Sequence, residues 1–310
     1  MRITNRMLIS NVLTNINNNL KVMSNTQKQM SSGKRVSRPS DDPIVVARVL
    51  SFKSALDSME QYDKNMQDAR GWVDASESAL SMATETLQRA RELAVYGANG
   101  TLPKESMQAL AHEIDQLIDE LVQTANTSYG GRFLFGGSYT TKAPFERTSD
   151  GDVIYKGNTH SLEWEIAPLV TITVNEDGEK VFMKVVDVDG DGNPDSSIFY
   201  VLNKLYEALG GKDPNSADHA EVAGTLGLLD QAIDHLLNIR ASLGARSNRL
   251  QMSQDRLFNS KISLTETMSK LEDIDLAEAV MNYKNQENVY QAALATAAMV
   301  LQPTLIDYLR

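Results

Sequence analysis

Hydrophobic residues recur at regular intervals near both ends of the chain. In the C-terminal third, a leucine stands at every seventh position: Leu229, Leu236, Leu243, Leu250, Leu257, Leu264 and Leu271. Near the N-terminus, a three-then-four spacing links Ile16, Leu20, Met23, Gln27 and Met30. Such spacing keeps one side of a helix turned toward a partner helix. We therefore expect helices at both ends that need each other, or further copies of the chain, to cover their apolar sides.

The last segment carries a second apolar stripe with almost no polar surface opposite to it. The stripe consists of Tyr290, Leu294, Ala297, Leu301, Leu305 and Tyr308, within an alanine-rich run. A helix that lacks a polar face is stable only when neighbours bury it on several sides. We therefore predict subunit-assembly contacts at these six residues and, near the N-terminus, at Ile16, Leu20, Met23 and Met30.

The remaining pattern predicts a mainly α fold with a β-rich insertion. Helical periodicity covers residues 3–31, 44–95, 103–127, 198–209 and about 216–271, with a last helix from 274. Alternation between turn residues predicts short strands at 132–135, 153–155, 162–166, 170–174 and 180–188. We expect a terminal coiled-coil domain (1–42 and 274–310), a helical bundle (43–131 and 212–273) and a small outer β domain (132–211). The middle of the leucine series, Leu229 to Leu264, should pack inside the subunit against the long helix that begins at Ile44.

Charge is distributed unevenly along a chain of 310 residues with a net charge of −11. Residues 1–40 hold seven basic residues and no acidic one, whereas residues 273–310 hold five acidic and two basic residues. Opposite signs favour pairing of the two ends, although two unrelated solvated faces would give the same pattern. A negative net charge argues against a nucleic-acid partner.

Several other features limit the class of protein. The chain has no cysteine, which suits a protein that meets both reducing and oxidising compartments. No apolar run is long enough to cross a membrane, and the basic end has no Trp or Phe anchor for a membrane surface. The N-terminus lacks the pattern of a cleaved secretory signal. We expect neither a membrane partner nor a signal peptide.

One acidic loop is a candidate calcium site. Counted from Asp187, carboxylates stand at the first, third, fifth and ninth positions (Asp187, Asp189, Asp191 and Asp195), and Gly192 stands at the sixth. This order resembles a calcium loop, but position twelve is Ile198, where an EF-hand needs a bidentate glutamate. The alternative is an acidic surface turn without an ion. We expect no other cofactor.

Catalytic patterns do not appear in the sequence. The dipeptide His112–Glu113 begins like a zinc-protease motif, but its fifth position is Gln116. No cysteine nucleophile and no Gly-x-Ser-x-Gly motif is present. The pair Asp41–Asp42 is explained by helix capping before Pro43. We predict that the protein is not an enzyme.

Three segments resemble a known family. The run Ser-Ser-Gly-Lys-Arg-Val-Ser-Arg-Pro-Ser-Asp-Asp-Pro (31–43) is similar to the N-terminal signature of bacterial flagellins and hook-associated proteins. Residues 286–293, 301–303 and 309–310 resemble the C-terminal signature of the same family. Residues 131–137 with 143–145 resemble the entry to the middle domain in the branch that joins hook to filament. Pro39 and Pro43 favour that branch over flagellin itself.

This resemblance implies a structural subunit of the bacterial flagellum at the junction between hook and filament. Such a subunit would form a homo-oligomeric ring beside another hook-associated protein and flagellin. It would leave the cell unfolded through the flagellar type III export apparatus, with an export chaperone of the FlgN type on its C-terminal helix. Its terminal helices would fold only among neighbours, because ordering a residue costs about 1–2 kcal/mol. Alternatives are a flagellin and, from another class, a calcium-binding surface adhesin.

Overall fold

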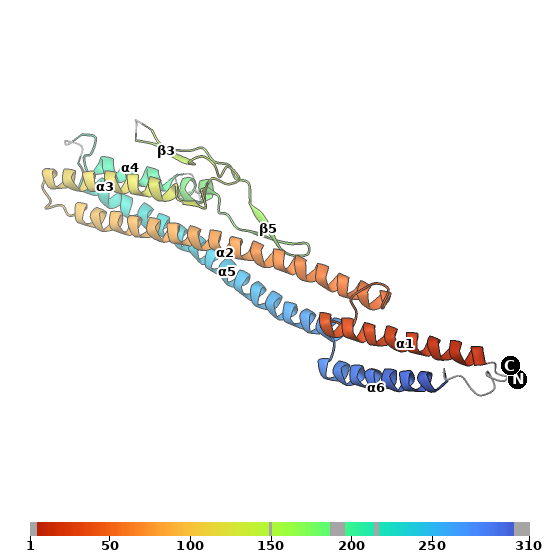
Figure 1. Ribbon diagram of the computed structural model, residues 1–310. Helices are drawn as coiled ribbons and strands as arrows, with labels where there is room; N and C mark the ends of the chain where they lie inside the picture. Colours follow the sequence, from red (N-terminus) through yellow and green to blue (C-terminus); the bar gives the residue numbers. More distant parts are fainter. Residues whose placement is uncertain (1–4, 149–150, 187–195, 214–216, 301–310) are drawn as a thin grey trace, which may run out of the picture. The chain divides into compact units, whose positions relative to one another are not determined.

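The computed structural model describes residues 5–148, 151–186, 196–213 and 217–300. The helices are α1 (Asn5–Ser32), α2 (Pro43–Gly97), α3 (Lys104–Ala125), α4 (Ile198–Ala208), α5 (His219–Glu272) and α6 (Leu276–Val300) (Figure 1). Two compact units are formed, one by residues up to Ser58 together with those from Phe258 onward, the other by Met59–Leu257. The predicted fold class, mainly α with a β-rich insertion, is confirmed.

In the first unit, α1 and α6 lie side by side and run in opposite directions (Figure 1). Their facing positions repeat with three-then-four spacing. On α1 the positions of this repeat, all buried or half-buried, are Ile9, Val12, Ile16, Asn19, Met23, Thr26 and Met30. On α6 they are Ala279, Tyr283, Gln286, Tyr290, Ala293 and Ala297; Gln29 and Glu287 are half-buried beside the repeat. The repeat is that of a coiled coil, in which side chains at these positions interlock.

The start of α2 follows the capping chemistry that the sequence predicts. Asp42 Oδ1 accepts hydrogen bonds from the backbone N–H groups of Ile44 and Val45, both at 3.0 Å. Pro43 is the first residue of the helix, where its missing N–H is not needed. Asp41 Oδ2 instead accepts a hydrogen bond from the backbone N–H of Arg38 at 3.0 Å. Asp42 therefore caps α2 as predicted, whereas Asp41 closes the turn before it and does not cap the helix.

In the second unit, the first four leucines of the series lie in the core. Leu229, Leu236, Leu243 and Leu250 are fully buried, while Leu257 packs against the same core with part of its surface exposed. The core also includes apolar residues of α2 and α3, such as Leu80, Leu87, Ile114 and Ile118. The prediction that Leu229–Leu264 pack inside the subunit is thus confirmed from Leu229 to Leu257, whereas Leu264 is half-buried and belongs to the first unit.

Within its described residues, the β region forms three separate two-stranded antiparallel sheets. Their pairs are β1 (Ser128–Tyr129) with β2 (Arg132–Phe133), β3 (Phe145–Arg147) with β4 (Val153–Tyr155), and β5 (Glu163–Ala167) with β6 (Val170–Thr173). An aromatic cluster joins the β3–β4 sheet to α4, with ring centroids of Phe145 and Phe182 5.2 Å apart and those of Phe182 and Phe199 6.1 Å apart. This cluster anchors that sheet to the helices.

The predicted strand at 180–188 is wrong over residues 180–183, and its last two residues lie outside the described residues. Residues Glu179–Met183 form η1, a π-helical turn. Asp177 Oδ1 accepts a hydrogen bond from the backbone N–H of Glu179 at 2.9 Å, which starts the turn. Val181 and Phe182 are both fully buried, whereas a strand would place two successive side chains on opposite faces.

Candidate assembly site on the terminal helices

A joint in the first unit holds the terminal helices to the chain segments that follow α1 and precede α6. Gly33 ends α1 with a φ of 69°, a backbone conformation that favours glycine. The backbone N–H of Arg35 donates to the carbonyl of Glu272 at 2.7 Å, and that of Ile274 donates to the carbonyl of Gly33 at 3.1 Å. These bonds form a short antiparallel bridge between Lys34 and Asp273.

A buried carboxylate lies at the centre of this joint. Glu272 at the end of α5 accepts hydrogen bonds from Lys34 Nζ at 2.5 Å and from Lys53 Nζ of α2 at 2.9 Å. Its side chain is 7% exposed, whereas the two lysines are 40% and 42% exposed. One carboxylate therefore links three parts of the chain: the end of α5, the segment after α1 and the first turns of α2.

The electrostatics of the joint favour the charged forms of Glu272 and Lys34. Burial alone would raise the pKa of Glu272, but the hydrogen bonds from Lys34 and Lys53 outweigh burial and hold this pKa below the usual glutamate range. The hydrogen bond to Glu272 raises the pKa of Lys34 above its usual value. The joint is therefore a charge-assisted contact that remains ionised at neutral pH.

Sequence reasoning missed this joint. Lys34 lies inside the family-like segment 31–43, and Glu272 directly follows the last leucine of the heptad series. These positions are 238 residues apart, and nothing in the local pattern specifies their pairing. The charge difference between residues 1–40 and 273–310 includes Lys34 but stops one residue short of Glu272.

The structure divides the residues predicted for subunit assembly into two groups. Ile16, Met23 and Met30 of α1, with Tyr290 and Ala297 of α6, lie in the contact between the two helices. Their apolar surface is covered, at least in part, within the subunit.

The second group faces outward. Leu20 is 39% exposed and Leu294 is 44% exposed. Leu301, Leu305 and Tyr308 lie outside the described residues. The predicted assembly role of Leu20 and Leu294 stays a prediction, and their exposure leaves them free to contact another chain.

Further apolar side chains are exposed on the same two helices. On α1 they are Met7, Leu13 and Val22, and on α6 they are Leu276, Val280, Met281, Val289 and Met299. Exposed apolar groups that gather on one part of a surface indicate an interaction site. Asn15, Asn17 and Asn18 of α1 are exposed as well, together with Lys21 and Lys28, so the rest of its surface is polar.

The candidate calcium residues Asp187, Asp189, Asp191 and Asp195 lie outside the described residues. Within the described part of the chain, no group of three or more acidic or histidine side chains is placed to hold a metal ion. The calcium site at this loop therefore stays a prediction from the sequence. The helices that the structure describes include none with the length and apolarity needed to span a membrane.

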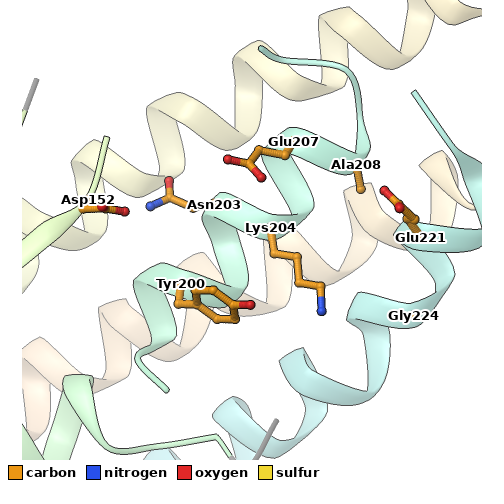
Figure 2. A pocket seen from close by; sticks show the side chains of 8 residues that line it. All are labelled: Asp152, Tyr200, Asn203, Lys204, Glu207, Ala208, Glu221 and Gly224. Atoms are coloured by element: carbon orange, nitrogen blue, oxygen red, sulfur yellow. The ribbon is translucent and has the colours of Figure 1, made fainter. Parts of the chain in front are cut away.

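A cavity of about 520 Å³ opens in the second unit beside α4 (Figure 2). It is lined by Asp152, Tyr200, Asn203, Lys204, Glu207, Ala208, Glu221 and Gly224. Asn203, Lys204 and Glu207 project from α4, and Glu221 projects from α5 (Figure 2). These lining residues include no serine, cysteine or histidine, so they offer no nucleophile–base pair of the kind that hydrolases use.

Comparison with known proteins connects both ends of the chain to one family. The bacterial flagellin N-terminal helical region matches residues 3–140, and the bacterial flagellin C-terminal helical region matches residues 226–309. The chain is 30% identical over 306 residues to flagellar hook-associated protein 3 of Escherichia coli K12, covering 94% of this chain and 95% of that protein. It is 29% identical over 310 residues to flagellin of Bacillus subtilis 168, covering 97% of each.

Solved structures share the fold. A putative flagellar hook-associated protein from Vibrio parahaemolyticus aligns with a TM-score of 0.65 at 23% identity, covering 75% of this chain and all of that chain. The flagellar hook-associated protein 3 from Legionella pneumophila aligns with a TM-score of 0.64 at 19% identity, covering 72% of this chain and 98% of that chain. At these identities the likeness concerns the fold alone.

Proposed function

This chain belongs to the bacterial flagellin family, and we propose that it is a structural subunit of the flagellum that connects the hook to the filament. The observation that supports this function most directly is similarity along almost the whole length of flagellar hook-associated protein 3 from Escherichia coli. Members of this family build flagellar structure, and we infer that this chain is a building block and not an enzyme.

The exposed apolar sides of α1 and α6 support assembly as the activity of the protein. Burial of a leucine side chain contributes about 1.5–3 kcal/mol, so contacts at Leu20 and Leu294, repeated around an oligomer, would make it long-lived. We expect the α1–α6 pair to be marginally stable alone, because Asn is a poor helix former, and to gain stability when neighbours cover it.

The partners follow from this function. We propose a homo-oligomeric ring with flagellin on one side and another hook-associated protein on the other, outside the cell. We further propose delivery through the flagellar type III export apparatus, with an export chaperone of the FlgN type that covers the apolar sides of α6 before export. Exposed Met281, Val289 and Leu294 are the residues that such a chaperone would shield from water.

A deletion strain tests the proposed function against the flagellin alternative. Loss of a junction subunit should leave cells with hooks that release flagellin into the medium. Loss of the filament subunit would leave no flagellin to release, and that result would overturn the proposal. Gold-labelled antibody on isolated hook–filament preparations should mark the junction and leave the length of the filament unlabelled.

A further inference from the structure

The turn between α2 and α3 contains the one Asn–Gly step of the chain, Asn99–Gly100. The backbone N–H of Leu102 donates a hydrogen bond to the carbonyl of Asn99 at 3.0 Å, so residues 99–102 form a β-turn. Asn99 and Gly100 are both exposed. The amide side chain of Asn99 is therefore open to water at a bend of the chain.

This side chain is folded back over the peptide bond that follows it. Asn99 Oδ1 accepts hydrogen bonds from the backbone N–H of Thr101 at 3.3 Å and from Thr101 Oγ1 at 3.0 Å. A side-chain oxygen that reaches the N–H two residues on lies over the intervening peptide, which brings Cγ of Asn99 toward the nitrogen of Gly100. The same two donors would stabilise the negative charge that develops on Oδ1 when a nucleophile adds to Cγ.

The backbone nitrogen of Gly100 is free to act as that nucleophile. Among the described residues, no oxygen accepts a hydrogen bond from its N–H. A Cβ atom added at Gly100 would meet nothing within 4 Å, so no neighbour restrains the backbone there. Glycine also reaches backbone conformations that are closed to other residues. Nothing in the described turn therefore holds this nitrogen away from Cγ of Asn99.

The step Asp177–Gly178 shows the same local turn without this freedom. Asp177 Oδ1 accepts a hydrogen bond from the N–H two residues on, that of Glu179, at 2.9 Å. Gly178, however, is buried, and a Cβ atom there would lie 2.3 Å from the carbonyl oxygen of Phe135. Its backbone cannot move toward the side chain before it. Asn99–Gly100 thus combines the folded-back side chain with a backbone that is free to react.

We propose that Asn99 is a site of spontaneous covalent modification, in which the nitrogen of Gly100 attacks Cγ of Asn99 and closes a succinimide ring. The N–Cγ bond forms, the proton of Gly100 passes to hydroxide, and the side-chain nitrogen takes a proton from water and leaves as ammonia. Water then opens the ring. Attack of water at Cγ gives aspartate, and attack at the main-chain carbonyl gives isoaspartate. No electron is transferred, and water is the one co-reactant.

Both products change the turn. Each replaces a neutral amide with a carboxylate, which makes the net charge of the chain one unit more negative than −11. Isoaspartate also inserts a methylene group into the main chain between Asn99 and Gly100, and this insertion displaces the carbonyl that accepts from Leu102. Because the reaction needs only water, it does not depend on what the chain assembles into. The converted fraction of Asn99 therefore rises with the time since synthesis.

Mass spectrometry of the purified full chain tests this inference. The protein is incubated in a mildly alkaline buffer made with heavy-oxygen water and is then digested in ordinary water, so that heavy oxygen marks only conversion in the intact chain. The peptide that contains Asn99 should gain the mass of an amide-to-acid change with heavy oxygen, and it should separate into two products. Asn126, whose amide pairs with the backbone of Phe145 at 2.8 and 2.9 Å, is the internal control and should remain an amide.

Two comparisons define the results that would overturn the inference. Gly100→Ala adds a Cβ atom that restricts the backbone, and it should slow the conversion of Asn99 by about tenfold. Equal rates in both proteins would show direct hydrolysis of the side chain and not attack by Gly100. A synthetic peptide of residues 96–103 measures the reaction without the fold. Conversion of this peptide, while the folded chain keeps Asn99 as an amide, would show that the fold protects the turn.

Discussion

Replacing Glu272 with glutamine removes the charge at the centre of the joint while keeping the size of the side chain. The carboxylate accepts two charge-assisted hydrogen bonds, at 2.5 Å from Lys34 and 2.9 Å from Lys53. Each such bond contributes about 1.5–3 kcal/mol when buried. Both lysines are about 40% exposed, so solvent screening reduces the contribution of these hydrogen bonds. We expect Glu272→Gln to lower the local stability of the joint by about 1–3 kcal/mol in total.

Amide hydrogen exchange with short labelling times measures this loss of stability at the joint itself. A loss of 1–3 kcal/mol raises local opening by roughly 5- to 150-fold, so peptides covering residues 30–36 and 270–282 should exchange faster by that factor. Glu266→Gln, the same change at an exposed position of α5, is the matched control. Equal exchange in Glu272→Gln and Glu266→Gln would refute the reasoning that the joint is held by this carboxylate.

The same joint predicts a pH dependence of definite sign. The pKa of Glu272 is lowered in the folded chain from the ordinary value of 4.5. Its stabilising contribution is therefore complete above that value and is lost as pH falls through the lowered pKa. Protection at the joint, taken relative to the intrinsic amide exchange rate at each pH, should fall in acid in the natural chain, and Glu272→Gln should remove this part of the acid response. An identical acid response in both proteins would contradict the assignment.

Three further predictions concern the rest of the molecule. Leu250→Ala, at a fully buried position, should lower the free energy of unfolding by about 2–5 kcal/mol in chemical denaturation. Gly137→Ala should destabilise the β region by about 1–3 kcal/mol, because φ is 66° and a Cβ atom would lie 1.9 Å from the carbonyl of Asn158. The control for Gly137→Ala is Gly100→Ala, where nothing lies within 4 Å of the added Cβ. Equal melting temperatures of these two variants would contradict the predicted backbone strain at Gly137. For the calcium hypothesis at residues 187–195, millimolar calcium should raise the melting temperature, and titration calorimetry without heat would exclude the ion.

The helices could be predicted from the sequence because their apolar period is long and regular. The predicted helix at 44–95 is α2 (Pro43–Gly97), and the leucine series lies on α5. Strands were less accessible, because a short apolar run does not reveal its own period. At 180–188 the capping carboxylate of Asp177 and the adjacent buried side chains of Val181 and Phe182 override the strand-like composition.

The assembly site was accessible to sequence reasoning only in part. The spacing identified Ile16 and Leu20 as members of one stripe, but it could not decide which of them faces the partner helix within the subunit. Only the pairing of α1 with α6 settles that point, and it leaves Leu20 exposed. Glu272 illustrates the same limit, since its partners Lys34 and Lys53 are brought to it by the fold of distant segments.

Maleimide labelling of Leu20→Cys and Leu294→Cys tests most directly whether sister subunits cover the exposed sides of the terminal helices. Each variant carries a single thiol, because the natural chain has none, and Leu169→Cys at a 99% exposed turn is the control. The account predicts rapid labelling of all three variants in the dilute subunit, and protection of Leu20→Cys and Leu294→Cys alone in isolated hook–filament preparations. Labelling of these two thiols at equal rates in the dilute and the assembled protein would contradict it.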